Sequence, residues 1–171
     1  MAICYRRLTF SPLGKSRRKP EYTVFYKQIR SINMTNSSNA VLAVSAADSQ
    51  AAIAHFSSSF RFETDCWDVH DALTSGQPGF VLLDVRSPAM YQAAHVPGAI
   101  NLVRGKIVAS RLAEYPAHTL FVTYCAGPHC NGAGKAALAL AKLGRPVKIM
   151  IGGVTGWLDE GFALTTAGAV G

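Results

Sequence analysis

The fold of this chain is decided by residues 120–133, which read LFVTYCAGPHCNGA. Residues 120–124 are a short apolar run, a pattern that predicts a buried strand. Residues 126–132 form a short loop, and an alanine-rich helix is expected from about Ala133 onward. The pattern therefore places Cys125 at the end of a strand and directly ahead of a helix.

A thiol in this position faces backbone N–H groups that have no partner inside the helix. Those groups and the positive end of the helix dipole stabilise a thiolate, which is the nucleophilic form of cysteine. An inert core cysteine would suit the middle of a strand better than its end. We therefore interpret Cys125 as a reactive nucleophile.

Strands and helices are expected to alternate along the chain. The other strand-like segments are 60–63, 80–85, 99–103 and 147–151. A capping box at Ser45 and Asp48 predicts a helix that ends near Phe56, and an N-cap at Asp65 predicts a helix to Thr74. Shorter helical segments are expected over 88–92, 106–114 and 154–160. This alternation predicts a parallel sheet covered by helices on both faces, with ligands at the carboxyl ends of its strands, where Cys125 lies.

The net charge of +7 is concentrated at the N-terminus. Residues 1–33 hold eight of the seventeen Lys and Arg but one of the ten acids, so residues 34–171 are formally neutral. We expect residues 1–33 to be a disordered basic extension, with Met34 as a candidate natural start, and residues 34–171 to form a single domain. An organelle transit peptide is an alternative for residues 1–33. No nucleic-acid partner is expected, because charge runs are usually solvated.

The chain shows no apolar segment of the length that a secretory signal or a membrane span requires, so we expect a cytoplasmic protein with no membrane partner. Its four cysteines, at positions 4, 66, 125 and 130, are too few for a disulfide scaffold, and reduced thiols are the default in that setting. Cys66 falls at helical spacing with Val69 and Leu73, so we expect it to be a small buried residue.

Four motifs, in this order, resemble the signatures of the rhodanese-like sulfurtransferase domain. They are LLDVR at 82–86, HVPGAINL at 95–102, the pair Tyr124-Cys125, and GGVTGW at 152–157. The resemblance is strongest over residues 60–164. It implies a three-layer α/β/α fold with a central, mostly parallel sheet of five strands.

By this resemblance the chain is a thiosulfate-type sulfurtransferase with Cys125 as its catalytic residue. The thiolate would take sulfur from a donor such as thiosulfate, hold it as a persulfide and pass it to a thiophilic acceptor. The implied partners are a small anionic sulfur donor and a thiol or cyanide-like acceptor, with a protein as a further candidate acceptor. The active-site loop comprises Ala126, Gly127, Pro128, His129, Cys130, Asn131 and Gly132. Its amides would donate charge-assisted hydrogen bonds to a persulfide anion.

The loop departs from the family at one position. Many members carry an Arg five residues after the cysteine, where this chain has Cys130, and no Arg or Lys lies between Cys125 and Lys135. The choice of donor is therefore open. Two roles are open for Cys130: a resolving thiol that attacks the persulfide or forms a disulfide with Cys125, and a loop residue that fills space. His129 is a secondary candidate for orienting a donor.

Asp84 and Arg86 are candidates for the rim of the site. They lie two residues apart on a predicted strand, so their side chains share a face. Arg86 would then add positive potential for an anionic donor, although an ion pair that braces loops is the interpretation we favour. His95, in the turn that follows, is also interpreted as structural, with its ring tied to neighbouring backbone.

A zinc site is not favoured, because the chain has one cluster of Cys and His rather than two. A cysteine phosphatase is not favoured either, because its loop needs an Arg to clamp the phosphoryl oxygens. No metal and no cofactor are expected, since no nucleotide, flavin or haem motif is present. One alternative class of function stays open: a non-catalytic rhodanese-like module that binds a partner or senses redox state through Cys125 and Cys130.

Overall fold

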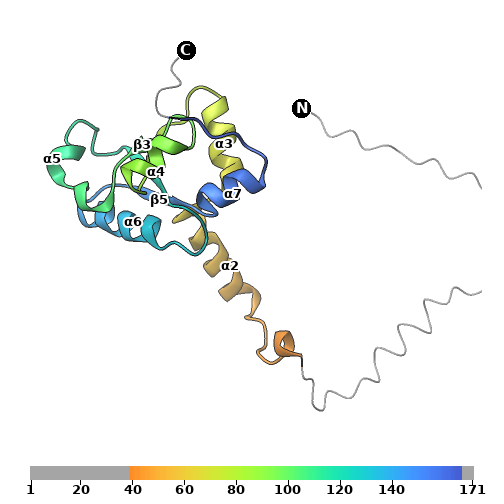
Figure 1. The fold of residues 1–171 in the computed structure, drawn as a ribbon. Coiled ribbons are helices and arrows are strands. Elements are labelled where there is room, and N and C mark those ends of the chain that lie inside the picture. Colours follow the sequence, from red (N-terminus) through yellow and green to blue (C-terminus); the bar gives the residue numbers. More distant parts are fainter. Residues whose placement is uncertain (1–38, 167–171) are drawn as a thin grey trace, which may run out of the picture. The chain divides into compact units, whose positions relative to one another are not determined.

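The structure, a computed structural model, describes residues 39–166 of the chain (Figure 1). The basic extension expected over residues 1–33 lies outside the described residues. The chain divides into two units, 1–46 and 47–171. In the first unit the structure describes residues 39–46, where a short 3-10 helix, η1, spans Ala40–Leu42.

The second unit alternates helices and strands along the chain. Its strands are β1 (Glu63–Thr64), β2 (Phe80–Asp84), β3 (Ile100–Asn101), β4 (Leu120–Tyr124) and β5 (Val147–Met150). Its helices are α2 (Ser49–Ser59), α3 (Cys66–Thr74), α4 (Pro88–Ala93), η2 (Arg104–Lys106), α5 (Ala109–Leu112), α6 (Gly132–Lys142) and α7 (Gly153–Asp159). None of the helices among the described residues is long and apolar enough to cross a bilayer.

The five strands form one sheet in the order β1-β5-β4-β2-β3, and every pair of neighbours is parallel. The expected α/β architecture with a parallel sheet of five strands is therefore confirmed. Because the strands are parallel, their carboxyl ends, from Asp84 of β2 to Met150 of β5, lie along one edge of the sheet. The Cys125 loop leaves from the end of β4, which is the central strand.

Two apolar cores lie on opposite faces of the sheet, which makes the unit a three-layer structure. Adjacent residues of one strand face opposite ways, so Leu82 and Val122 enter one core while Leu83 and Phe121 enter the other. The first core is covered by α3 and α7, with Trp157 almost fully buried, and the second by α5 and α6. Figure 1 shows α6 apart from α3 and α7, in keeping with this division.

Several expected boundaries shift in the structure. Asp48 itself is the N-cap of α2, with its carboxylate accepting a hydrogen bond from the Ala51 amide (2.9 Å), so the expected capping box that begins at Ser45 is wrong. Residues 60–62 form a turn and β1 begins at Glu63, while the strand expected over 99–103 is reduced to Ile100–Asn101. Both short strands lie at the edges of the sheet, where each has one neighbour to pair with.

A buried ion pair joins the carboxyl ends of the strands. Arg86 Nη2 lies 2.6 Å from Asp84 Oδ2, and the two side chains are 6% and 0% exposed. The Tyr124 hydroxyl donates to the same carboxylate (2.8 Å) and accepts a hydrogen bond from the Val96 amide (3.1 Å). The Asn101 side chain donates to the carbonyl oxygens of Asp84 and Arg86. This cluster links β2, β3 and β4 where the loops begin.

Protonation in this cluster is fixed by burial and charge. Burial and the Asp84 carboxylate raise the pKa of the Tyr124 hydroxyl well above its usual value, so Tyr124 remains a hydrogen-bond donor. Burial opposes the charge of Arg86, but the hydrogen bond to Asp84 and the charge of that carboxylate raise the pKa of Arg86 overall. The guanidinium therefore stays charged and committed to Asp84.

We predict that Asp84→Asn lowers the free energy of unfolding by about 3–5 kcal/mol, because it leaves the Arg86 charge buried without its partner. Urea unfolding followed by circular dichroism measures the change. Asp159→Asn, at an exposed position in α7, is the matched control and should change stability by less than about 0.5 kcal/mol. Equal effects of the two substitutions would show that the ion pair does not brace the sheet.

Candidate active site

Cys125 lies where the sequence places it, between the end of β4 at Tyr124 and the start of α6 at Gly132. The loop curls back on itself because the Cys130 amide donates to the Gly127 carbonyl oxygen (3.0 Å), with Pro128 at the second position of the turn. The N-cap residue Asn131 makes no side-chain hydrogen bond to the first turn of α6. The amides of that turn therefore have no side-chain cap and, as in any α-helix, no intrahelical partner.

The second wall of the loop is the turn between β5 and α7. The Val154 amide donates to the Cys125 carbonyl oxygen (3.1 Å), and the Thr155 amide and hydroxyl both donate to the Ala126 carbonyl oxygen. The sequence alone identifies GGVTGW at 152–157 as a family signature but predicts no contact for Thr155. The GGVTGW motif carries Thr155, but nothing in one sequence shows which loop it would contact.

Three glycines let the backbone segments approach closely. A Cβ atom at Gly153, where φ is +59°, would lie 2.5 Å from the Cys125 carbonyl oxygen. A Cβ at Gly127 would lie 2.6 Å from Thr155 Oγ1, and one at Gly132 would lie 2.8 Å from Cys125 Sγ. These are distances that real Cβ atoms essentially never show, so a side chain at any of the three positions would force its neighbours to move.

The two loop cysteines are joined in a disulfide between Cys125 and Cys130, with their Cα atoms 6.3 Å apart. The general expectation of reduced thiols is therefore not met for this pair, and the disulfide alternative for Cys130 is the one that the structure shows. The one sequence feature that pointed to this disulfide was the spacing of five residues between the two cysteines. Cys125 is 8% exposed, and Cys130 is half-buried.

A hollow of about 290 Å³ lies beside the two cysteines. It is lined by loop residues between 125 and 133, by the end of β5 over 149–151, and by the Gly152-Gly153 turn. Cys125 therefore borders an accessible space in spite of its low exposure. No charged side chain is among these lining residues. The structure adds Ile149, Met150 and Ile151 to the expected site, and sequence reasoning did not find them.

The remaining loop residues differ in exposure. Ala126 and Gly132 are half-buried, while His129 and Asn131 are exposed. The exposed His129 is not among the residues that line the hollow. Neither of these exposed polar side chains lines the hollow at Cys125.

Asp84 and Arg86 form the buried pair described above and do not line the hollow at Cys125. Arg86 also donates to the Ala94 carbonyl oxygen, which ties the end of β2 to the turn after α4. The His95 ring makes a hydrogen bond through Nδ1 with the Tyr91 carbonyl oxygen (2.8 Å) and stacks on the Tyr91 ring. The structure thus engages all three polar side chains in internal contacts.

Cys66 differs from Cys125 in its surroundings. It is a free thiol, 5% exposed, at the start of α3, and its Sγ donates to the Ile151 carbonyl oxygen (3.4 Å). Burial and the nearby negative charges of Asp65 and Glu160 raise the pKa of the Cys66 thiol to about 11. Cys66 therefore stays protonated near neutral pH and packs beneath the Gly152 turn, in keeping with a small buried residue.

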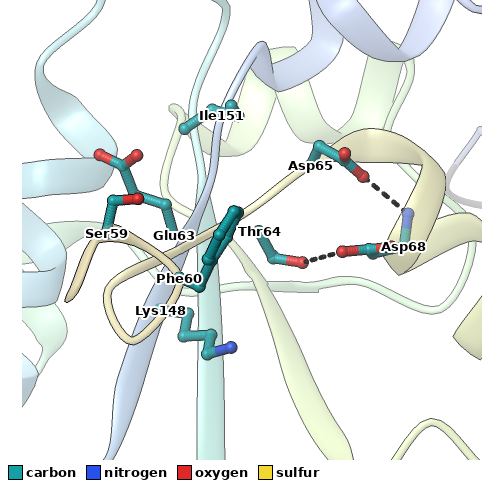
Figure 2. Close-up of a pocket in the computed structure, with 8 residues that line it drawn as sticks. All are labelled: Ser59, Phe60, Glu63, Thr64, Asp65, Asp68, Lys148 and Ile151. Atoms are coloured by element: carbon teal, nitrogen blue, oxygen red, sulfur yellow. Dashed lines mark hydrogen bonds between the residues drawn. The ribbon is translucent and has the colours of Figure 1, made fainter. Parts of the chain in front are cut away.

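A second hollow, of about 170 Å³, lies beside β1 (Figure 2). Two of its three acidic side chains make local hydrogen bonds: Asp65 accepts from the Asp68 amide as the N-cap of α3, and Asp68 accepts from the Thr64 hydroxyl. It holds no thiol or histidine. Within residues 39–166 no group of three or more His, Cys, Asp or Glu side chains is placed to hold a metal ion. The candidate active site is therefore the Cys125 loop.

Comparison with known families agrees with this geometry. A sequence model of the rhodanese-like domain matches residues 68–160, which is more than half of the chain. The chain belongs to the rhodanese-like domain family. The match spans the Cys125 loop, the Asp84–Arg86 pair and the glycine turn before α7.

Relatives of this rhodanese-like domain include proteins of different organisation. The BH2092 protein from Bacillus halodurans is 34% identical with a TM-score of 0.67, over 70% of this chain and 87% of that chain. The HTH-type transcriptional regulator Rv0324 of Mycobacterium tuberculosis is 38% identical over 90 residues, which are 53% of this chain. The chain spans only 39% of the length of that curated relative.

A thiosulfate sulfurtransferase from Pseudomonas aeruginosa shares the fold of this rhodanese-like domain. The TM-score is 0.53 at 23% identity, over 68% of this chain and 22% of that chain. At this identity the similarity establishes the fold alone.

We predict that Gly132→Ala slows oxidation of the Cys125–Cys130 pair by diamide about tenfold or more, because overpacking costs about 1–3 kcal/mol and 1.4 kcal/mol is a factor of ten. The new methyl group would displace both sulfur atoms, since Cys130 Sγ also lies only 3.2 Å from the Cβ position. Intact mass after timed quenching measures the rate.

The matched control is Gly134→Ala in the same helix, where the nearest side-chain atom, Ile149 Cδ1, lies 3.9 Å from the Cβ position. This variant should oxidise at the rate of the unchanged protein. A Gly132→Ala variant that oxidises equally fast would show that the space at Gly132 does not control the position of the sulfur atoms.

Proposed function

We propose that this rhodanese-like domain is a sulfurtransferase that carries sulfane sulfur as a persulfide on Cys125. The observation that carries the proposal is the position of Cys125, at the carboxyl end of the central strand, beside the uncapped first turn of α6 and at the border of an open hollow. The thiolate of Cys125 attacks the outer sulfur of a donor and releases the rest of the donor as its leaving group. An acceptor then takes the sulfur from the persulfide.

Main-chain amides are the groups available to hold the persulfide anion. The first turn of α6 presents N–H groups without intrahelical partners, and the positive end of the helix dipole lies at the same place. Hydrogen bonds to a charged acceptor are about twice as strong as neutral ones, which favours the anionic sulfur over a neutral thiol. The glycines at 127, 132 and 153 keep side chains out of this space.

The family resemblance suggests thiosulfate as a donor, with cyanide or a thiol as acceptor. Thiosulfate carries two negative charges, and the hollow at Cys125 offers it no cationic side chain. We therefore expect thiosulfate to serve as a donor in the test tube but with a high KM. Donors of lower charge, such as a persulfide on a small thiol or on a protein, fit the apolar wall of Ile149, Met150 and Ile151 better.

The disulfide supports a second candidate, a redox-sensing module in which oxidation of Cys125 and Cys130 changes binding to a partner. The two candidates differ in one property. A sulfurtransferase accepts sulfur from a donor and passes it on, whereas a module that only senses redox state forms the disulfide and never carries an added sulfur.

We predict that Cys125→Ser abolishes formation of thiocyanate from thiosulfate and cyanide, because serine cannot form a persulfide. After thiosulfate, intact mass should show the gain of one sulfur atom in Cys130→Ser, which keeps Cys125 as its single loop thiol, and no gain in Cys125→Ser. Cys66→Ala, which removes a thiol outside the loop, is the matched control and should keep thiocyanate formation. Full thiocyanate formation by Cys125→Ser would exclude Cys125 as the sulfur carrier.

We further predict that Cys130→Arg raises kcat/KM for thiosulfate about 10- to 100-fold, because a hydrogen bond to a charged group contributes about 1.5–3 kcal/mol. The substitution places a cation where many family members have one. Initial rates of thiocyanate formation measure the change, with Cys130→Ser as the control for loss of the thiol alone. If the two variants have the same kcat/KM, the absence of a cation does not limit the reaction with thiosulfate.

A further inference from the structure

Cys125 and Cys130 are placed for direct reaction with one another. Their sulfur atoms are bonded, and the Cα separation of 6.3 Å falls within the usual span for disulfides of 4.4–6.8 Å, so the bond needs no large movement of the backbone. The turn closed by the Cys130 amide and the Gly127 carbonyl oxygen holds Cys130 over Cys125. Gly132 leaves the space in which both sulfur atoms lie.

The geometry selects which sulfur of a persulfide Cys130 would attack. The atom that the structure brings to Cys130 is Sγ of Cys125, which is the inner sulfur of a Cys125 persulfide. Attack on the inner sulfur expels the outer one, whereas attack on the outer sulfur would move it to Cys130. Because Cys130 contacts Sγ of Cys125, its attack releases the outer sulfur and does not transfer that sulfur to Cys130.

We propose that Cys130 is a resolving thiol that releases the sulfur carried by Cys125 as sulfide, so that the domain reduces sulfane sulfur at the expense of a dithiol. This proposal rests on the proposed persulfide on Cys125. The reductase reaction consumes the same sulfur that an external acceptor would otherwise take. The Cys125–Cys130 disulfide is then an intermediate of turnover.

The reaction balances in three steps. First, the Cys125 thiolate takes the outer sulfur of thiosulfate and releases sulfite. Second, the sulfur of Cys130 forms a bond to Cys125 Sγ, the bond between Sγ and the outer sulfur breaks, and the outer sulfur leaves as HS⁻ with the proton of the Cys130 thiol. The sulfane sulfur gains two electrons, which the two cysteine sulfurs lose. Third, an external dithiol reduces the disulfide and becomes a disulfide itself.

The difference in exposure between Cys125 and Cys130 determines which sulfur of the disulfide the external dithiol attacks in the third step. Cys130 is half-buried and Cys125 is 8% exposed, so a dithiol in solution reaches the Cys130 sulfur first. Its attack there makes Cys125 the leaving thiolate, and the amides at the start of α6 stabilise that thiolate. Reduction therefore returns Cys125 in the form that attacks the next donor.

A single turnover without reductant tests the proposal. The full chain is reduced, freed of reductant and mixed with one equivalent of thiosulfate under argon, and sulfite, sulfide and intact mass are measured. Omission of the dithiol matters, because an external thiol would also release sulfide from a persulfide. The unchanged protein should release equal amounts of sulfite and sulfide and lose the mass of two hydrogen atoms.

Cys130→Ser should release sulfite but no sulfide and should keep the mass of one added sulfur atom, while Cys66→Ala should behave as the unchanged protein. Sulfite without sulfide from the unchanged protein, with the added sulfur retained, would overturn the role of Cys130 and leave the proposed function intact. The absence of sulfite would overturn the proposed function, and the role of Cys130 with it. The unchanged protein decides between these outcomes even if a variant folds poorly.

Discussion

The site depends on a close approach of backbone to backbone around Cys125. At Gly153 a side chain would collide with the Cys125 carbonyl oxygen, and at Gly132 it would collide with the Cys125 sulfur, so a side chain at either position would force its neighbours to move. Main-chain amides are the donors that remain in such a space, and they carry partial charges in fixed directions. In the proposed function these amides hold the anionic sulfur, because no cationic side chain lines the hollow at Cys125.

The charged side chains of Asp84 and Arg86, at the carboxyl end of β2, fix the loops at this edge of the sheet and do not enter the Cys125 site. The Arg86 guanidinium donates hydrogen bonds to the Asp84 carboxylate and to the Ala94 carbonyl oxygen. The Tyr124 hydroxyl donates to the same carboxylate and accepts from the Val96 amide. This buried cluster fixes the ends of the strands from which the loops leave. None of these charged side chains lines the hollow beside Cys125.

Much of this arrangement could be predicted from the sequence, because local signals were sufficient. The N-cap at Asp65, the apolar run before Cys125 and the loop into α6 are each set by residues close together in the chain. The start of α2 was misplaced because Ser45 and Asp48 are comparable N-cap residues, and only backbone geometry decides between them.

Contacts between distant segments could not be predicted in this way. The bond between the Asp84 carboxylate and Tyr124 spans forty residues, and the wall of the hollow at 149–151 depends on how β5 pairs with β4. The Cys125–Cys130 disulfide is local in sequence, but a spacing of five residues does not set the distance between two sulfur atoms. A crystal structure of Cys130→Ser treated with thiosulfate decides whether loop amides hold the transferred sulfur. We expect the outer sulfur of a Cys125 persulfide to accept hydrogen bonds from main-chain amides between residues 126 and 134. An outer sulfur in contact only with the side chains of residues 149–151 would rule out binding of the persulfide by those amides.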